Sequence, residues 1–285
     1  MLIGSHISLS SPDYLLNSLK ETRKNGANCM MIYLGSPQNA KLIDDEKLKI
    51  EEYKVFASEI NYNINNTIIH APYIINLANK NNNEFSINFL NDEIKKMINI
   101  GSKILVLHPG NATNGISISE AIDNLSHIIN SLIVPNDIKL CIETMSGKGT
   151  EIGKNFSEIK NIIEKIKNKD IIGVCLDTCH IWDSGYNLNN VDYILEEFDK
   201  IIGIKYLKIV HLNDSKNECG AKKDRHENIG YGKIGFDNLI KLAYHNKLIN
   251  IPKILETPFY NNISPYKQEI NMILEKKFTN WKKII

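Results

Sequence analysis

Residues 103–132, KILVLHPGNATNGISISEAIDNLSHIINSL, contain an apolar run, a turn-forming segment and an amphipathic pattern in succession. The apolar run over 103–108 predicts a short buried strand. After the turn, apolar residues recur every three or four positions, which predicts a helix with one buried face; they are Ile118, Ala121, Ile122, Leu125, Ile128, Ile129 and Leu132. This stretch is typical of one βα unit.

The same alternation continues along the chain. Apolar runs predict eight strands, at 2–7, 28–34, 66–70, 103–108, 138–143, 171–177, 205–212 and 252–256. Helical patterns lie between them, at 11–25 with Ser11 as the cap and Pro12 in the first turn, at 87–100, 118–132, 156–167, 191–202 and 236–248.

Eight such units predict an α/β fold, a closed (β/α)₈ TIM barrel whose site lies at the C-terminal ends of the strands. An open doubly wound sheet is the alternative, but the glycine-rich phosphate turn that it would need does not follow the first strand. Since no linker or long charge run divides the sequence, we expect residues 1–285 to form a single domain.

The composition also bounds the function. A hydrophobic content of 42% and a charged content of 24% allow a sizeable core and argue against a disordered or membrane protein. The formal net charge of +1 argues against a broad basic surface, so a nucleic acid would have to be bound in a local groove. The chain starts directly with its first predicted strand and shows no leader or membrane span, which favours the cytoplasm.

The cysteines predict neither a disulfide framework nor a metal site. They are odd in number and unclustered, and we interpret them as small, mostly buried residues in a reducing compartment; they are Cys29, Cys141, Cys175, Cys179 and Cys219.

Metal-ligand residue types recur where the predicted strands end. The third to eighth predicted strands end at His70, His108, Glu143, Asp177, His211 and Glu256. The loops after the sixth and seventh strands add His180, Asp224 and His226. One such residue alone is more often structural, but the strand ends of a barrel converge on one opening. Histidine with carboxylate suits zinc, manganese or iron, and nine residues suffice for two or three ions. Several adjacent ions are suited to phosphodiester hydrolysis.

Longer motifs make the sequence recognisable. They are Gly4–Ser8, His70–Tyr73, His108–Gly110, Gly173–His180, His211–Lys216 and Asp224–Gly230. Through them the chain resembles the endonuclease IV family of apurinic/apyrimidinic (AP) endonucleases over essentially its whole length. The resemblance implies a zinc-dependent enzyme of DNA base excision repair. It would hydrolyse the phosphodiester 5′ to an abasic site in double-stranded DNA, leaving a 3′-hydroxyl and a 5′-deoxyribose phosphate, and would also clear blocked 3′ ends. We expect a monomer.

The resemblance further implies three zinc ions per chain, with Mn²⁺ or Fe²⁺ as alternatives at some sites. The first would be held by His70, His108 and Glu143, the second by Glu143, Asp177, His211 and Glu256, and the third by His180, Asp224 and His226. Glu143 and Glu256 would be the catalytic carboxylates. Glu143 would bridge the first two ions, and Glu256 would help to position the attacking water between them. The third ion would stabilise the leaving 3′ oxygen.

DNA contacts are also implied by the resemblance. Tyr73 and Ile74 match positions that the family inserts at the lesion, and Gln38 and Asn39 match a loop that enters the minor groove. Some family members have Arg in place of Gln38. A basic patch beside the site, including Lys216 and Arg225, would hold phosphates; it also contains Lys222 and Lys223.

Three further interpretations remain. We expect His6 to be a hydrogen-bonded residue at the base of the pocket. A sugar isomerase or epimerase on a similar barrel is the first alternative function, although it gives Asp224 and His226 no role. A non-catalytic DNA-lesion binder is the second, and it would have little need for Glu256.

Overall fold

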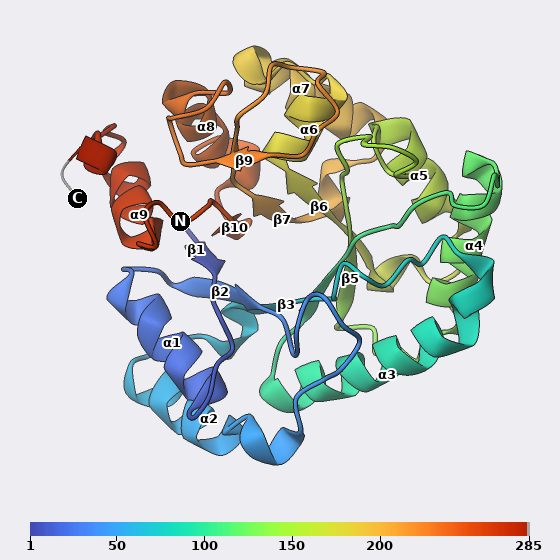
Figure 1. Cartoon of the computed structure of the whole chain (residues 1–285), viewed down its shortest axis with the longest axis horizontal. Coiled ribbons are helices and arrows are strands. Elements are labelled where there is room, and N and C mark those ends of the chain that lie inside the picture. The colour runs from blue at the N-terminus through green and yellow to red at the C-terminus, as the bar shows by residue number, and fades with distance from the viewer. Residues whose placement is uncertain (284–285) are drawn as a thin grey trace.

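A closed barrel of eight parallel strands forms the centre of the computed structural model, which describes residues 1–283 (Figure 1). The strands are β1 (Ile3–His6), β2 (Cys29–Ile32), β3 (Thr67–His70), β4 (Ile104–Leu107), β5 (Lys139–Glu143), β6 (Ile172–Asp177), β7 (Leu207–His211) and β10 (Lys253–Leu255). Their order is β1-β10-β7-β6-β5-β4-β3-β2, and β1 closes the barrel by pairing with both β10 and β2. Each strand lies within its predicted run, so the predicted TIM barrel is confirmed.

Helices surround the strands (Figure 1). They are α1 (Tyr14–Lys24), α2 (Ile50–Glu59), α3 (Asn83–Ile100), α4 (Ile118–Ser131), α5 (Phe156–Lys165), α6 (Thr178–Ser184), α7 (Val191–Ile201), α8 (Phe236–Ala243) and α9 (Tyr266–Glu275). In α4 the start is set by a capping box, in which Ser117 and Glu120 each accept a hydrogen bond from the other's backbone N–H. The patterns had not singled out α2, α6 or α9.

The predicted start of α1 is wrong. Ser11 does not cap the helix, which begins at Tyr14 after Asp13, and no side-chain cap bond is made there. The chain instead turns over residues 11–13, and the Tyr14 N–H donates to the Ser10 carbonyl. Pro12 therefore lies in a turn that precedes the helix.

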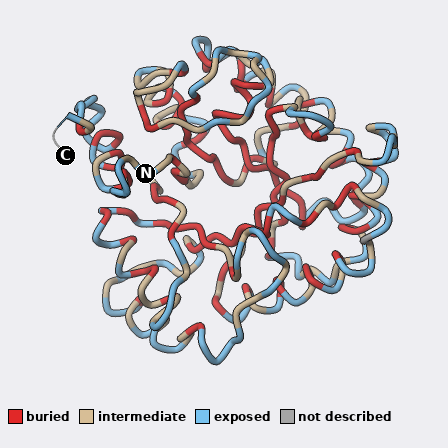
Figure 2. Tube along the Cα trace, in the orientation of Figure 1, coloured by how far each residue is buried: buried red, intermediate tan, exposed pale blue. Residues whose placement is uncertain are grey.

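Buried residues follow the strands, and exposed residues lie on the outer sides of the helices (Figure 2). Successive strand side chains alternate between the barrel interior and the helix layer. The interior cluster is fully buried and consists of Cys29, Met31, Ile68, Val106, Cys141, Cys175, Ile209 and Ile254. The expected burial of most cysteines is thus confirmed, with Cys29, Cys141, Cys175 and Cys179 buried, and all five are free thiols.

A short antiparallel hairpin of β8 (Asp214–Ser215) and β9 (His226–Glu227) follows β7 and was not predicted. Its connecting loop carries the basic patch. None of the helices within residues 1–283 combines the length and apolar character that a membrane crossing requires.

Candidate metal centre

The structure brings all nine predicted ligand residues to the C-terminal ends of the strands. Four are the last residues of their strands, namely His70 of β3, Glu143 of β5, Asp177 of β6 and His211 of β7. The others come directly after β4 and β10, from the first turn of α6, or from the hairpin, and are His108, Glu256, His180, Asp224 and His226. The fold thus gathers residues that lie up to 186 positions apart, from His70 to Glu256.

Glu143 lies at the centre of the cluster and is completely buried. Its Oε2 is 3.1 Å from Nε2 of His70 and 3.2 Å from Nε2 of His108. Its Oε1 is 3.1 Å from Nδ1 of His211 and 3.3 Å from Nδ1 of His180. One carboxylate therefore faces nitrogen atoms of four histidines.

The remaining carboxylates extend the cluster on both sides. Glu256 Oε2 is 3.0 Å from His211 Nδ1, and Asp224 Oδ1 is 3.1 Å from His180 Nε2. The Nε2 of His226 lies 3.6 Å from Asp224 Oδ1 and 3.7 Å from an Asp177 oxygen. These last two distances exceed a hydrogen bond. They suit groups that share a cation between them.

The donor atoms fall into compact groups. Within each group they all lie within 4.8 Å of one another, and three of the groups are His70, His108, Glu143; Glu143, Asp177, His211, Glu256; and His180, Asp224, His226. Two further groups include the thiol of Cys175 or Cys179. Burial raises the pKa of Cys175 to about 12, which keeps this thiol protonated and makes it a poorer donor than its neighbours.

Second hydrogen bonds fix the orientation of three histidine rings. The Nδ1 of His70 lies 2.7 Å from the Ala71 carbonyl, that of His180 lies 2.8 Å from the Thr144 carbonyl, and that of His226 lies 3.2 Å from the Glu256 carbonyl. A carbonyl only accepts, so Nδ1 carries a proton and Nε2 is the atom available to a metal ion, as in metal-binding histidines. The Nε2 of His226 is buried and has no hydrogen-bond partner among residues 1–283. The donor set therefore fits divalent metal ions.

Electrostatics favour a positive charge at this centre. Burial raises the pKa of Glu143, but the charges of His211 and His108 outweigh it and hold that pKa well below its usual range. Burial lowers the pKa of His180, but Asp177 and Asp224 more than compensate and raise it well above its usual range. Glu143 thus remains ionised and attracts a cation.

Asn213 orients two of the carboxylates, a role that sequence reasoning missed. Its amide is fully buried, donates to Asp177 Oδ2 at 2.7 Å and accepts from the Glu256 backbone N–H at 2.8 Å. In the sequence, Asn213 stands within the motif His211–Lys216. Its position two residues after His211, the end of β7, was the available signal.

Asp183 holds the hairpin loop and was also missed. Its buried carboxylate accepts hydrogen bonds from Ser215 Oγ at 2.7 Å, Asn217 Nδ2 at 2.9 Å and the Asp224 N–H at 2.8 Å. Asp224 itself has a left-handed backbone with φ of 54°. The anchor therefore offsets an unfavourable conformation that directs Asp224 toward His180.

The predicted DNA-contacting residues lie on loops around the same opening. Tyr73 and Ile74 are 49% and 53% exposed, three and four residues after His70. Tyr73 also borders a hollow of about 660 Å³ that His108 and Asp224 line.

The other predicted DNA contacts are exposed. Gln38 and Asn39 follow β2 and make no hydrogen bond to the ligand cluster within the described part of the chain. Lys216 and Arg225 lie opposite each other, and the Lys216 N–H donates to the Arg225 carbonyl. Their contacts with DNA stay predictions.

His6 differs from the expectation. Its Nε2 is buried but lacks a hydrogen-bond partner within residues 1–283. The ring instead packs edge-on against Tyr33, with 4.7 Å between centroids, and Tyr33 in turn lies 5.0 Å from the His70 ring. Burial lowers the pKa of His6 to about 4, so this ring is neutral.

Sequence comparisons identify relatives over nearly the whole chain. Residues 19–276 match the family described as xylose isomerase-like TIM barrel. The probable endonuclease 4 of Mycoplasma mobile is 48% identical over 275 residues, which cover 96% of this chain and 98% of that protein. The probable endonuclease 4 of Ureaplasma parvum serovar 3 is 46% identical, covering 98% and 95%.

Structural comparisons show a shared fold. Endonuclease IV from Thermus thermophilus superposes with a TM-score of 0.84 at 24% identity, covering 97% of this chain and 100% of the other. A D-tagatose 3-epimerase-like protein superposes with a TM-score of 0.69 at 20% identity, covering 97% and 96%. Because a nuclease and an epimerase-like protein share this fold, the barrel alone does not separate the two activities.

Proposed function

The chain belongs to the endonuclease IV family of DNA-cleaving hydrolases, and on that premise we propose that it cuts the phosphodiester 5′ to an abasic site. The products would be a 3′-hydroxyl and a 5′-deoxyribose phosphate. The observation that carries the proposal is the cluster of nine His, Asp and Glu residues in a chain 48% identical to a probable endonuclease 4. We propose that the same centre also clears blocked 3′ ends.

Three zinc ions would be held by the three thiol-free groups of the centre, with Mn²⁺ or Fe²⁺ as alternatives. The first group is His70, His108 and Glu143, the second is Glu143, Asp177, His211 and Glu256, and the third is His180, Asp224 and His226. Their compactness, within 4.8 Å, supports this assignment. When bound, such ions lower the pKa of water and neutralise charge on phosphate oxygens.

The protein's own residues would divide the remaining work. Glu143 and Glu256 are the catalytic carboxylates, and Glu256, whose side chain is 17% exposed while that of Glu143 is buried, is the one that solvent water can reach. Glu256 would therefore help to position and activate the attacking water. Glu143 positions the histidines of the first two groups, and Asn213 fixes Glu256 and Asp177 relative to each other.

Loops at the opening would recognise the lesion. Exposed Tyr73 and Ile74 would enter the space left by the missing base, where unstacking costs least. Gln38 and Asn39 would reach the minor groove. Lys216 and Arg225 would hold backbone phosphates; their exposure supports these roles.

The protein would act as a monomer on double-stranded DNA in the cytoplasm. We treat residues 1–285 as one catalytic domain. The pairing of Ile3 with Lys253 supports this, since the barrel closes only when both ends of the chain are present.

The decisive experiment uses a labelled duplex oligonucleotide with one abasic site. Incision 5′ to the lesion, with no incision of the matching undamaged duplex, is expected. Elemental analysis of protein purified without added metal should find roughly three zinc ions per chain. Failure to cut, together with epimerisation of a ketose, would favour the alternative enzyme class.

A further inference from the structure

A hollow of about 660 Å³ opens beside the metal centre, between the loops that follow β4 and β5. Its lining includes His108 and Asp224, which belong to two different ligand groups, and Tyr73 from the loop after β3. A strand bound with its phosphate at the centre would therefore pass through or beside this hollow.

Lys148 brings a free positive charge to the lining. The nearby Glu151 is occupied, because its Oε2 accepts from Ser146 Oγ at 3.0 Å and from the Lys148 backbone N–H at 2.9 Å. Within residues 1–283 the Lys148 ammonium itself makes no ion pair or hydrogen bond.

The loop that carries Lys148 has a fixed shape. Gly147 and Gly149 flank it with φ of 78° and 59°, a left-handed region that glycine adopts without strain. The Ala112 N–H donates to the Thr150 carbonyl at 2.9 Å, which ties this loop to the one after β4. This hydrogen bond holds the loop against its neighbour, and the exposed lysine lies between the two glycines.

We propose that Lys148 binds a backbone phosphate of the DNA next to the one held at the metal centre. The inference rests on the proposed function. A phosphate in this hollow would meet the carboxylates of Asp224 and Glu151, and a lysine with three unused N–H donors offsets their repulsion. Lys148 would thus be a substrate-binding residue outside the strand-end pattern.

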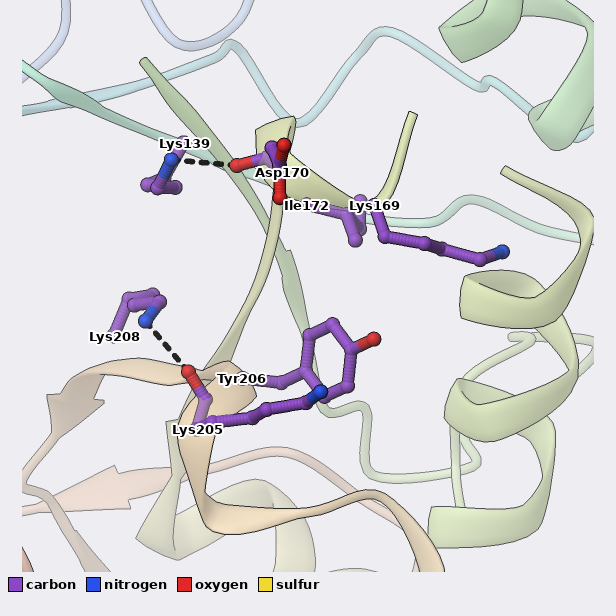
Figure 3. A pocket seen from close by; sticks show the side chains of 7 residues that line it. All are labelled: Lys139, Lys169, Asp170, Ile172, Lys205, Tyr206 and Lys208. Carbon is purple, nitrogen blue, oxygen red and sulfur yellow. Dashed lines mark hydrogen bonds between the residues drawn. The ribbon is translucent and has the colours of Figure 1, made fainter. Parts of the chain in front are cut away.

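A matched control lies at the opposite end of the barrel. There a hollow of about 270 Å³ is lined by Lys139, Lys169, Asp170, Ile172, Lys205, Tyr206 and Lys208, at the N-terminal ends of β5 to β7 (Figure 3). Lys205 is exposed and has no carboxylate partner in the described part of the protein, as for Lys148. Lys205→Ala therefore removes an equal charge that does not face the metal centre.

The test measures binding of an abasic duplex and of the matching undamaged duplex as salt is raised from about 50 to 200 mM. Lys148→Ala should weaken binding about 3- to 10-fold and reduce the slope of log affinity against log salt by about one. Lys148→Arg should restore most of both, because it keeps the charge. Lys205→Ala should behave as wild type, and all variants should keep the wild-type metal content.

A wild-type salt slope for Lys148→Ala, or an equal loss for Lys205→Ala, would overturn the inference. Loss of metal from Lys148→Ala would also overturn it, since the loop would then have a structural role. Failure of the proposed function is a separate result, because it appears as uncut abasic duplex with the wild-type protein. The slopes on undamaged duplex would still decide the role of Lys148.

Discussion

The two ends of the barrel carry opposite charges and satisfy them in different ways. At the C-terminal end, the buried carboxylates of Glu143 and Asp177 face histidine nitrogens. At the N-terminal end, Lys139 and Lys208 donate to the backbone carbonyls of Asp170 and Lys205 (Figure 3). The lysines are satisfied by carbonyls and solvent. The buried carboxylates and histidine nitrogens remain a site for a cation. The C-terminal end therefore carries the catalytic site, and the N-terminal end has a structural role.

A local irregularity produces the N-terminal arrangement. Between β6 and β7 the register shifts, so that Leu207 pairs with Val174 and Ile209 with Cys175, and Lys208 is the extra residue. A Cβ on Gly173 would lie 2.7 Å from Cγ of Lys208, so glycine is required for the lysine stem to pass. The Lys208 stem thus passes beside Gly173, close to Cys141 of the interior cluster, at the N-terminal end of the barrel.

The largest expected effect separates the two ends by activity. Glu256→Gln should slow incision by about 100- to 10,000-fold, because the amide cannot accept the proton of the attacking water. The affinity for the abasic duplex should stay within about threefold of wild type, since a negatively charged carboxylate does not attract the DNA phosphates. Single-turnover incision and equilibrium binding measure the two quantities.

Lys208→Ala is the matched change at the N-terminal end, and its incision rate should stay within about twofold of wild type. Comparable losses in both variants would mean that the contrast between the ends is wrong. A normal rate for Glu256→Gln would remove Glu256 from catalysis.

The next effect concerns how the metal end is held together. Asp183→Asn should weaken binding of the third ion about 10- to 100-fold, because an amide cannot accept all the hydrogen bonds that hold Asp224 in place. Elemental analysis after dialysis against a weak chelator should find about two ions per chain instead of three.

Asp214→Asn provides the control. The buried carboxylate of Asp214 holds the segment that follows the β8–β9 hairpin, by accepting from the N–H groups of Gly230, Gly232 and Ile234. The variant should lose stability but keep the third ion. Equal metal loss in both variants would indicate general unfolding of the hairpin and not a specific anchor.

Much of this contrast could be predicted from the sequence because it is local in the chain. Each of the eight strands is a short apolar run, and six of the ligand residues end or directly follow such a run. A short stretch of sequence therefore predicts both the strand and its ligand residue. The start of α1 was mispredicted because Ser11 and Pro12 suit a turn as well as a helix start.

The residues that were missed act through distant contacts. Asp183 is polar in a short helix, and only the folded hairpin, more than 30 residues later, gives it partners. Lys148 is one of many exposed lysines until the loops after β3, β4 and β5 surround it. Asn213 pairs with residues 36 and 43 positions away. No periodicity or spacing contains these relations.

The smallest expected effect extends the comparison to a third buried carboxylate. Glu93 in α3 is as buried as Glu143, but its two oxygens have no hydrogen-bond partner within residues 1–283. It lies on the apolar face of the helix, three residues after Leu90 and four before Met97. Without histidines, burial alone acts and raises the pKa of Glu93 well above its usual range.

Because the folded state raises this pKa, the contribution of Glu93 to stability is greatest below the pKa of the unfolded chain and is lost as the pH rises toward the folded-state value. Glu93→Gln should therefore be more stable than wild type at pH 8, with an advantage that shrinks toward pH 5 by at most about 1.4 kcal/mol per pH unit. Urea unfolding across this range measures the difference. Asp92→Asn on the same helix, where the carboxylate is exposed and paired with Lys95, should show a nearly constant offset. A pH-independent difference in stability for Glu93→Gln would mean that Glu93 gains a partner in solution. The lack of neighbouring histidines would then not explain why its pKa differs from that of Glu143.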